Sequence, residues 1–210
     1  AIFARVESIY LSQLMSNISY SRSVFFELDL ISLLYLRMSK ASCKPVDKMY
    51  NYLQYHLVRN TEKKLYKVFD RVGFVSLVDR EYAEFFFPNY GGSKFFNIRN
   101  GVNLRDKPLE RSVNSGKENI KIGFSGDFAY KPNLLAAHFI INEIIPELKT
   151  NHKDYTIILI GRNPDQHMLV NSKIDPVNLI VTGEVADPLD EISKLDIYFS
   201  PLFVGTGMKN

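Results

Sequence analysis

Leu195-Asp-Ile-Tyr-Phe-Ser-Pro-Leu-Phe-Val-Gly-Thr-Gly-Met-Lys-Asn210 is the stretch that decides the fold, because it places an apolar strand directly before a Gly-x-Gly turn. Glycines in such a turn leave backbone N–H groups uncovered, and a following helix would add the positive end of its dipole. Both features suit phosphate oxygens. The stretch is therefore a candidate nucleotide site, although taken alone a simple turn is the commoner reason for glycines after a strand.

The composition is that of a globular protein. With 210 residues and 46% apolar side chains, the chain can form one large or two small domains. No apolar run approaches the roughly 18–20 residues that span a bilayer, and no signal peptide is evident, so we expect a cytoplasmic location. The single cysteine, Cys43, and the four scattered histidines show no metal-ligand spacing. We therefore expect no metal site.

The charge is unevenly distributed along the chain. Residues 1–115 hold 17 Lys and Arg against 11 Asp and Glu, whereas residues 116–210 hold 9 against 12. A basic half favours anionic lipids, phosphorylated acceptors or nucleic acid, while a solvated helix face explains it equally well. Peripheral contact of the basic half with the inner face of a membrane is left open.

Strands and helices alternate in the first half of the pattern. The spacing predicts helices over 4–18, from Pro45 to Phe69 and over 79–87, and strands over 23–29, 72–77 and 94–99. The long helix is predicted to be amphipathic, with apolar positions at Met49, Leu53, Leu57, Leu65, Val68 and Phe69. Residues 105–118 lack apolar periodicity and are predicted to be a linker.

A second alternating series follows the linker. It has predicted strands over 120–125, 155–160, 178–181 and 196–200, with helices over 133–149 and 187–194. Such alternation is typical of parallel sheets covered on both faces, whose ligands bind at the carboxyl ends of the strands. Gly126, Gly161, Gly183 and Gly205 all follow strands, so we expect them to gather at one edge. The prediction is an α/β protein with a first domain at 1–104 and a second at 119–210.

Motifs in this order resemble the retaining GT-B glycosyltransferases of the "glycosyl transferases group 1" class, and among them the family 4-like sugar transferases of bacterial polysaccharide assembly. The resemblance covers about residues 27–210 and is carried by Phe74-Val-Ser-Leu-Val-Asp79, Asn100-Gly-Val102, Gly126-Asp-Phe-Ala-Tyr-Lys-Pro-Asn133, Gly161-Arg-Asn-Pro164, Val181-Thr-Gly-Glu-Val-Ala-Asp187 and Pro201–Asn210. It implies two Rossmann-like units of a GT-B fold.

The resemblance also implies a reaction and its sites. A sugar would pass with retention from a nucleotide-diphosphate-sugar donor to a glycan or lipid-linked acceptor, with no cofactor, metal or nucleic acid. The enzyme would be a hexosyl-type transferase whose leaving diphosphate is stabilised electrostatically. The residues that the resemblance assigns to donor binding are Gly126, Lys131, Arg162, Gly183, Glu184, Val185, Gly205, Thr206, Gly207, Met208 and Lys209.

The chain departs from the family in two places. Asp127 stands where many relatives carry an arginine that neutralises the diphosphate, which leaves Lys131 as the nearest cation in sequence. The helix that brings the family's glutamates is missing after Asn210, so we expect both units to be incomplete, the chain to be a fragment, and residues 1–210 alone to be inactive. Asp29, at an acidic strand end, is the candidate catalytic residue in the first domain.

Two other classes of protein fit parts of the pattern. A non-catalytic nucleotide- or sugar-binding α/β module would carry the same glycines after its strands. A nucleic-acid binder would explain the mixture of basic and aromatic side chains near Tyr50, Tyr52 and Tyr55, but these tyrosines fall on several faces of one predicted helix rather than on a sheet. The glycosyltransferase interpretation accounts for more of the chain than either.

Overall fold

The computed structural model describes residues 3–6, 21–90, 92–99, 101, 119–151 and 154–206. The chain divides into two compact units, between Asn103 and Leu104 and again between Phe203 and Val204. The segment Val204–Thr206 therefore counts with the first unit, whereas the sequence pattern had grouped it with the second. The predicted linker, 105–118, lies outside the described residues.

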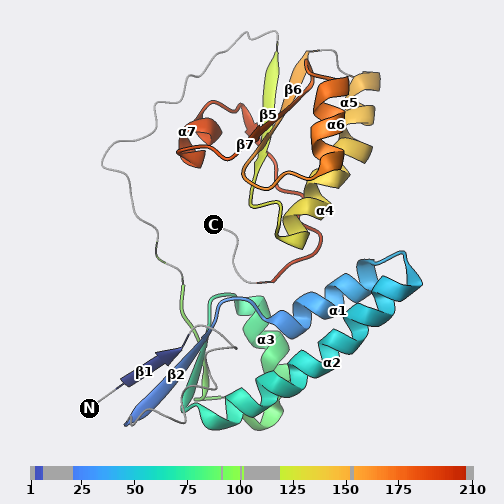
Figure 1. The fold of residues 1–210 in the computed structure, drawn as a ribbon. Helices are drawn as coiled ribbons and strands as arrows, with labels where there is room; N and C mark the ends of the chain where they lie inside the picture. Colours follow the sequence, from blue (N-terminus) through green and yellow to red (C-terminus); the bar gives the residue numbers. More distant parts are fainter. Residues whose placement is uncertain are drawn as a thin grey trace. The chain divides into compact units, whose positions relative to one another are not determined.

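The first unit is built on a parallel sheet of order β1-β2-β3-β4 (Figure 1). Its strands are β1 (Phe3–Val6), β2 (Arg22–Glu27), β3 (Arg71–Phe74) and β4 (Phe95–Asn97). The helix predicted over 4–18 is wrong at its start, because Phe3–Val6 pairs in parallel with Arg22–Phe25. Pairing with a neighbouring strand overrides local periodicity there. Residues 7–20 lie outside the described residues.

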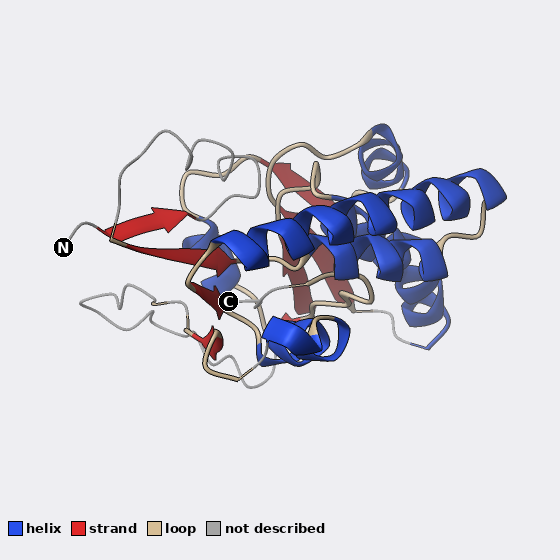
Figure 2. Cartoon of the chain, turned by 90° about the horizontal axis from the view of Figure 1, so that it is seen from below, coloured by secondary structure: helices blue, strands red, loops and turns tan. Residues whose placement is uncertain are grey.

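Three helices accompany this sheet: α1 (Ile31–Ala41), α2 (Pro45–Val68) and α3 (Leu77–Phe86), followed by the short η2 (Pro88–Tyr90). Helices α1 and α2 run side by side (Figure 1, Figure 2). The sequence pattern predicted α2 and α3 but missed α1. Helix α1 has Leu30 at its N-cap and no side-chain capping hydrogen bond, so the usual start signal is absent.

The core of the first unit is largely aromatic. The Tyr66 ring lies 5.3 Å from that of Phe95 on β4 and 5.2 Å from that of Phe87 at the end of α3, in edge-to-face contacts that pack α2 against both. The part of the predicted apolar stripe that runs through Met49, Leu53 and Leu57 does not enter this core, because these side chains are 55–61% exposed. This part faces solvent, and the end of the helix at Leu65 and Tyr66 enters the core.

The second unit holds a parallel sheet of order β7-β6-β5-β8. Its strands are β5 (Ile120–Ser125), β6 (Tyr155–Ile160), β7 (Leu179–Gly183) and β8 (Ile197–Tyr198). Helix α4 (Lys131–Phe139) continues through a π-helical turn, η3 (Ile140–Ile144), into α5 (Ile145–Asn151), so the single helix predicted over 133–149 has a wider turn in its middle. Helices α6 (Gln166–Ile174) and α7 (Pro188–Ser193) complete the unit.

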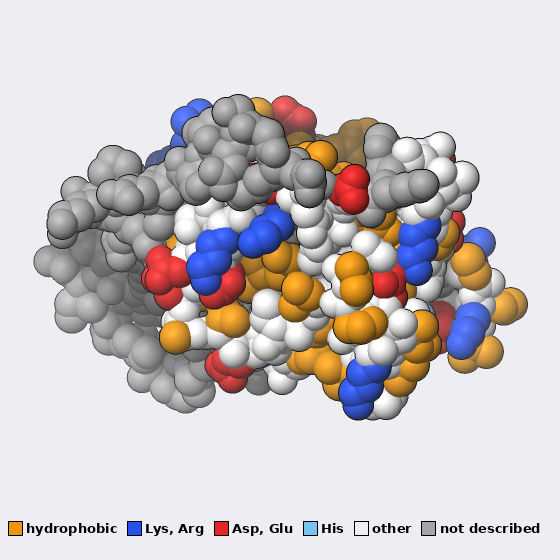
Figure 3. Space-filling model, turned by 90° about the horizontal axis from the view of Figure 1, so that it is seen from above, with side chains coloured by type: hydrophobic (Ala, Val, Ile, Leu, Met, Phe, Trp, Pro, Cys, Tyr) orange, Lys and Arg blue, Asp and Glu red, His pale blue; other side chains and the backbone are white. Residues whose placement is uncertain are grey.

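Helices cover both sides of this sheet. Helices α4, α5 and α6 lie on one side and α7 on the other (Figure 1). Gly123, on the central strand β5, leaves room for Leu195, because a Cβ at Gly123 would lie 2.3 Å from Leu195 Cδ1. On the face drawn in Figure 3, apolar, basic and acidic side chains are interspersed rather than sorted into one charge. Among the described helices, none is both long and apolar enough to cross a membrane.

Candidate functional site

Three of the predicted glycines meet at the carboxyl edge of the second sheet. Gly126 follows β5, Gly161 follows β6 and Gly183 ends β7. The Gly161 N–H donates to the Gly183 carbonyl at 3.2 Å. A Cβ at Gly161 would lie only 1.9 Å from the Gly126 oxygen, and the Gly161 φ is +141°. The two loops approach this closely because Gly161 has no side chain.

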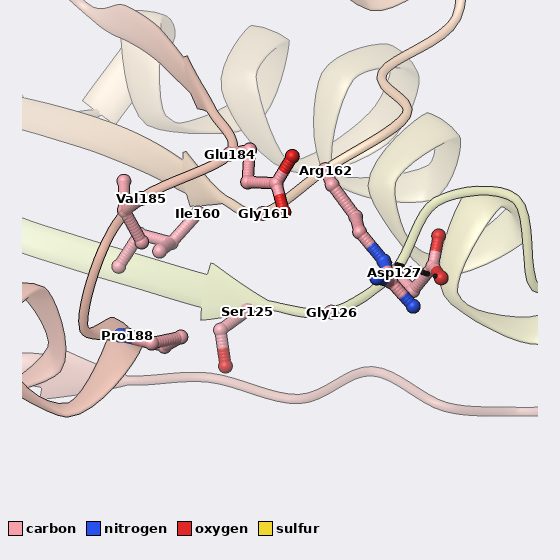
Figure 4. Close-up of a pocket in the computed structure, with 9 residues that line it drawn as sticks. All are labelled: Ser125, Gly126, Asp127, Ile160, Gly161, Arg162, Glu184, Val185 and Pro188. Carbon is pink, nitrogen blue, oxygen red and sulfur yellow. Dashed lines mark hydrogen bonds and ion pairs between the residues drawn. The ribbon is translucent and has the colours of Figure 1, made fainter.

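A pocket of about 380 Å³ opens at this edge. Backbone from the strand ends forms its floor, and both apolar and charged side chains surround it. The lining residues are Ser125, Gly126, Asp127, Ile160, Gly161, Arg162, Glu184, Val185 and Pro188. In the view of Figure 4, Val185 and Pro188 lie to the left and the Arg162–Asp127 pair to the right. The pocket therefore offers an apolar part and a charged part.

The charged part is organised around Asp127. Arg162 Nε donates to Asp127 Oδ2 at 2.9 Å, and Asn163 Nδ2 donates to Asp127 Oδ1 at the same distance. The Ala129 N–H donates to Asp127 Oδ1 at 3.0 Å. The hydrogen bonds from Asn163, Ala129 and Arg162 lower the pKa of Asp127 below its ordinary value. The ionised carboxylate thus holds the Arg162 guanidinium at the mouth of the pocket.

The remaining predicted donor residues are distributed differently. Lys131 begins α4 and is exposed, and it is not among the residues that line the pocket. Gly205 and Thr206 belong to the first unit, where Thr206 Oγ1 donates to Asp29 Oδ1 at 3.3 Å and Arg37 Nη1 donates to the Gly205 carbonyl. Gly207, Met208 and Lys209 lie outside the described residues.

The pocket residues therefore bring together four of the predicted donor residues, namely Gly126, Arg162, Glu184 and Val185, with Gly183 directly beside them. Asp29, the predicted catalytic residue, contacts Thr206 of the glycine loop within the first unit. Their parts in donor binding and catalysis stay predictions. Sequence reasoning missed Asp127 as a partner of Arg162, because 35 residues separate the two in the chain.

A buried acidic cluster in the first unit also escaped the sequence analysis. Glu27, Glu62 and Asp79 are each at most 4% exposed. Tyr66 Oη donates to Glu27 Oε2 at 3.0 Å, and the Ser32 N–H donates to Glu62 Oε1 at 2.9 Å. Burial raises the pKa of Glu62 to about 7 and raises that of Glu27 well above its ordinary value. These carboxyl groups are held where water cannot stabilise their charge.

A histidine–aspartate cluster lies on the helices of the second unit. His138, Asp165 and His167 each place one ligand atom within 4.8 Å of the others. This cluster was not predicted from the sequence, because His138 lies on α4, Asp165 caps α6 and 27 residues separate them. The expectation that no metal-ligand set exists rested on sequence spacing alone.

No family model matches the sequence, and no curated protein matches it. Solved structures do match. A UDP-forming α,α-trehalose-phosphate synthase from Burkholderia xenovorans in complex with glucose-6-phosphate is 11% identical with a TM-score of 0.63, covering 100% of this chain and 54% of that chain. TarM is 10% identical with a TM-score of 0.57, covering 93% and 35%.

The N-terminal domain of Candida albicans trehalose-6-phosphate phosphatase is 12% identical with a TM-score of 0.53, covering 99% of this chain and 51% of that chain. The chain thus spans between about a third and just over half of these structures. At such low identities the likeness concerns the fold. The chain has the α/β fold of GT-B glycosyltransferases, with two Rossmann-like units built on parallel sheets.

Proposed function

We propose that the protein is a glycosyltransferase that moves a sugar from a nucleoside-diphosphate-sugar to a glycan or lipid-linked acceptor. The observation that carries the proposal is the pocket at the carboxyl edge of the second parallel sheet, which Gly126, Gly161 and Arg162 line together. In open parallel sheets this edge is where nucleotides bind. The similar solved structures include UDP-forming synthases, which makes a uridine nucleotide the first donor to test.

The two parts of the pocket suit the two parts of such a donor. The nucleoside base would pack on the apolar part, beside Ile160, Val185 and Pro188. The diphosphate would lie over the glycine backbone near Arg162, whose planar guanidinium binds phosphate oxygens in pairs. Asp127 orients that guanidinium, which favours donor binding, and its negative charge repels the diphosphate, which opposes it. The balance of these two effects sets its contribution to donor affinity.

The chemistry we propose is retaining transfer of a hexosyl group in polysaccharide biosynthesis. The leaving diphosphate would be stabilised by amides and cations, which lowers the barrier by stabilising charge as it develops. Asp29 is the proposed catalytic carboxylate, and Gly205 and Thr206 belong to the same proposed donor machinery. Lys131 is proposed as a second cation that acts from the first turn of α4.

The acceptor side would meet a membrane through α2. Four exposed apolar side chains recur at helical spacing, from Val46 through Met49 and Leu53 to Leu57, and are 55–79% exposed. Lys44, Lys48 and Lys63 are exposed near them. An apolar stripe flanked by lysines fits the surface of an anionic bilayer, to which each basic residue contributes about 1 kcal/mol.

Release of nucleoside diphosphate from UDP-, GDP- and ADP-hexoses tests the reaction. We expect the full-length protein to act on one of these donors, and Arg162→Ala to lower kcat/KM at least tenfold. Arg99→Ala, at an exposed arginine of the first unit, is the matched control and should leave it unchanged. A failure of all three donors to bind or react, or equal rates for Arg162→Ala and the parent, would overturn the proposal.

Sedimentation with lipid vesicles tests the membrane contact. We expect binding to phosphatidylglycerol vesicles that weakens as salt rises, since exposed charges are screened over about 8 Å at physiological ionic strength. Leu53→Asp should abolish it. Ile174→Asp adds the same charge at a 75% exposed position on α6 and should leave vesicle binding unchanged. Equal binding to phosphatidylcholine vesicles, or unchanged binding of Leu53→Asp, would rule the contact out.

A further inference from the structure

We infer that His138, Asp165 and His167 form a binding site for a divalent ion of the zinc type on the second unit. None of the three lines the strand-end pocket, so the inference is independent of the proposed transferase reaction. It rests on the positions of three potential ligand atoms, on an unsatisfied ring nitrogen and on the way the fold holds Asp165 in place.

The three side chains converge from two helices. His138 lies near the end of α4, and His167 lies in the first turn of α6, which packs beside it (Figure 1). His138 Nε2 is 2.8 Å from Asp165 Oδ2, and the two imidazole rings are 4.6 Å apart between centroids. Two imidazoles and one carboxylate are a donor set that suits zinc, with further positions left for water.

The His167 ring carries the second observation. Its Nδ1 is buried and has no hydrogen-bond partner among the described residues. A buried imidazole nitrogen without a partner costs free energy, because it has lost its hydrogen bond to water. A metal ion bound by His138, Asp165 and His167 Nδ1 would accept the lone pair of that nitrogen. The nitrogen would then have a partner, and the cost would be removed.

The fold holds Asp165 ready to act as a ligand. Its Oδ1 accepts from the Met168 N–H at 3.0 Å, which caps the start of α6, and this leaves Oδ2 directed at His138. Asp165 thus has one oxygen committed to the cap and the other beside His138.

The site is compact and open enough for an ion to enter. The side chains of His138 and Asp165 are 30% and 33% exposed. With zinc–nitrogen bonds of about 2.0–2.1 Å, neighbouring ligand atoms of a tetrahedral site lie about 3.4 Å apart. Binding of the ion would draw the three ligand atoms, which now lie within 4.8 Å of one another, to that spacing. The ion would then tie the end of α4 to the start of α6.

Titration of the untagged protein with Co²⁺ and Zn²⁺ tests the site. We expect one ion per chain, visible d–d absorption from bound Co²⁺ and its loss when Zn²⁺ is added. His138→Ala and His167→Ala should each weaken Zn²⁺ affinity at least tenfold. Zn²⁺ should raise the Tm of the parent but not of these variants, since a ligand of the folded state stabilises it.

Two further variants keep the test decisive. Asp165→Asn retains a side chain that can cap α6 and removes only the charged ligand, so it should fold normally and bind Zn²⁺ at least tenfold more weakly. His56→Ala removes an exposed histidine of the first unit and should bind like the parent. Absence of Zn²⁺ binding below millimolar concentration, or parent-like binding by Asp165→Asn, would overturn the inference.

Discussion

Asp127 shows how one residue can oppose a function that its neighbours favour. Its carboxylate accepts a hydrogen bond from Arg162 Nε at 2.9 Å and two further hydrogen bonds. Its negative charge is therefore fixed beside Arg162, the cation that we propose binds the diphosphate. From the sequence, Asp127 was recognised as a departure from the family that the chain resembles. Its hydrogen bond with Arg162 is seen only in the structure. Glu184, which also lines the pocket, adds a second negative charge.

Asp127→Asn should therefore tighten the binding of UDP by about threefold, or about 0.7 kcal/mol, because it removes a repulsive charge and releases Arg162. Uridine carries no phosphate, so its affinity should not change. Isothermal titration of parent and variant with both ligands measures the difference. Weaker UDP binding by the variant would mean that Asp127 acts mainly by orienting Arg162.

Glu62 should make the protein less stable as pH rises. Its ordinary pKa of 4.5 is raised to about 7 in the folded state, so the folded state binds more protons than the unfolded state between these values. The stability that protonated Glu62 contributes is full below pH 4.5 and is lost as pH rises to about 7, with a slope of at most about 1.4 kcal/mol per pH unit.

Glu62→Gln should accordingly gain stability relative to the parent by about 1 kcal/mol per pH unit from pH 5 to 7, as measured by urea unfolding. Two other buried acids, Glu27 and Asp79, are present in both proteins, and the charge of Glu62 contributes to the raised pKa of Glu27, so the measured difference includes this coupling. Glu143→Gln, at an exposed position on η3, is the control. If the free energies of unfolding of Glu62→Gln and the parent differ by the same amount at every pH in this range, folding does not raise the pKa of Glu62.

At the scale of elements, the sequence predicted the strands best. Buried parallel strands such as β6 are short runs of apolar residues bounded by turn residues, and the predicted and observed bounds of β6 coincide. Helix α1 was missed because no capping side chain marks its start. Strand β1 was predicted as a helix because the local sequence does not show that it pairs with β2. Long-range pairing accounts for the error at β1, and the missing cap accounts for the error at α1.

The predicted meeting of strand ends depends on the loops after β5 and β6. Gly161→Ala should destabilise the second unit by about 2–4 kcal/mol, since its Cβ would overlap the Gly126 oxygen at a φ of +141°. Gly101→Ala meets no atom of the described residues within 4 Å of the added Cβ, and Gly101 has no positive φ, so the stability of the variant should match the parent. Thermal and urea unfolding of both variants measures this. An equally stable Gly161→Ala would contradict the close approach of these loops.

For the whole molecule, the predicted pair of parallel sheets is observed and agrees with the likeness to GT-B structures. The glycine loop, however, belongs to a different unit from the one that the sequence pattern predicted. Val204–Thr206 lies with Asp29 and Arg37 in the first unit, although the pattern had joined it to the second series of strands. Sequence spacing assigns a loop to the strand before it. The contacts made by the loop itself decide where it packs, and no local pattern reports them.

Two substitutions on either side of β7 test whether a nucleoside diphosphate binds at the carboxyl edge of the second sheet. Val185 lines the pocket after the strand, and Val177, which is 72% exposed, precedes it. Isothermal titration with UDP, GDP and ADP measures the affinity of each Val→Phe variant. We expect Val185→Phe to weaken nucleotide binding at least tenfold and Val177→Phe to bind nucleotide like the parent. Parent-like binding by Val185→Phe would contradict nucleotide binding at this edge.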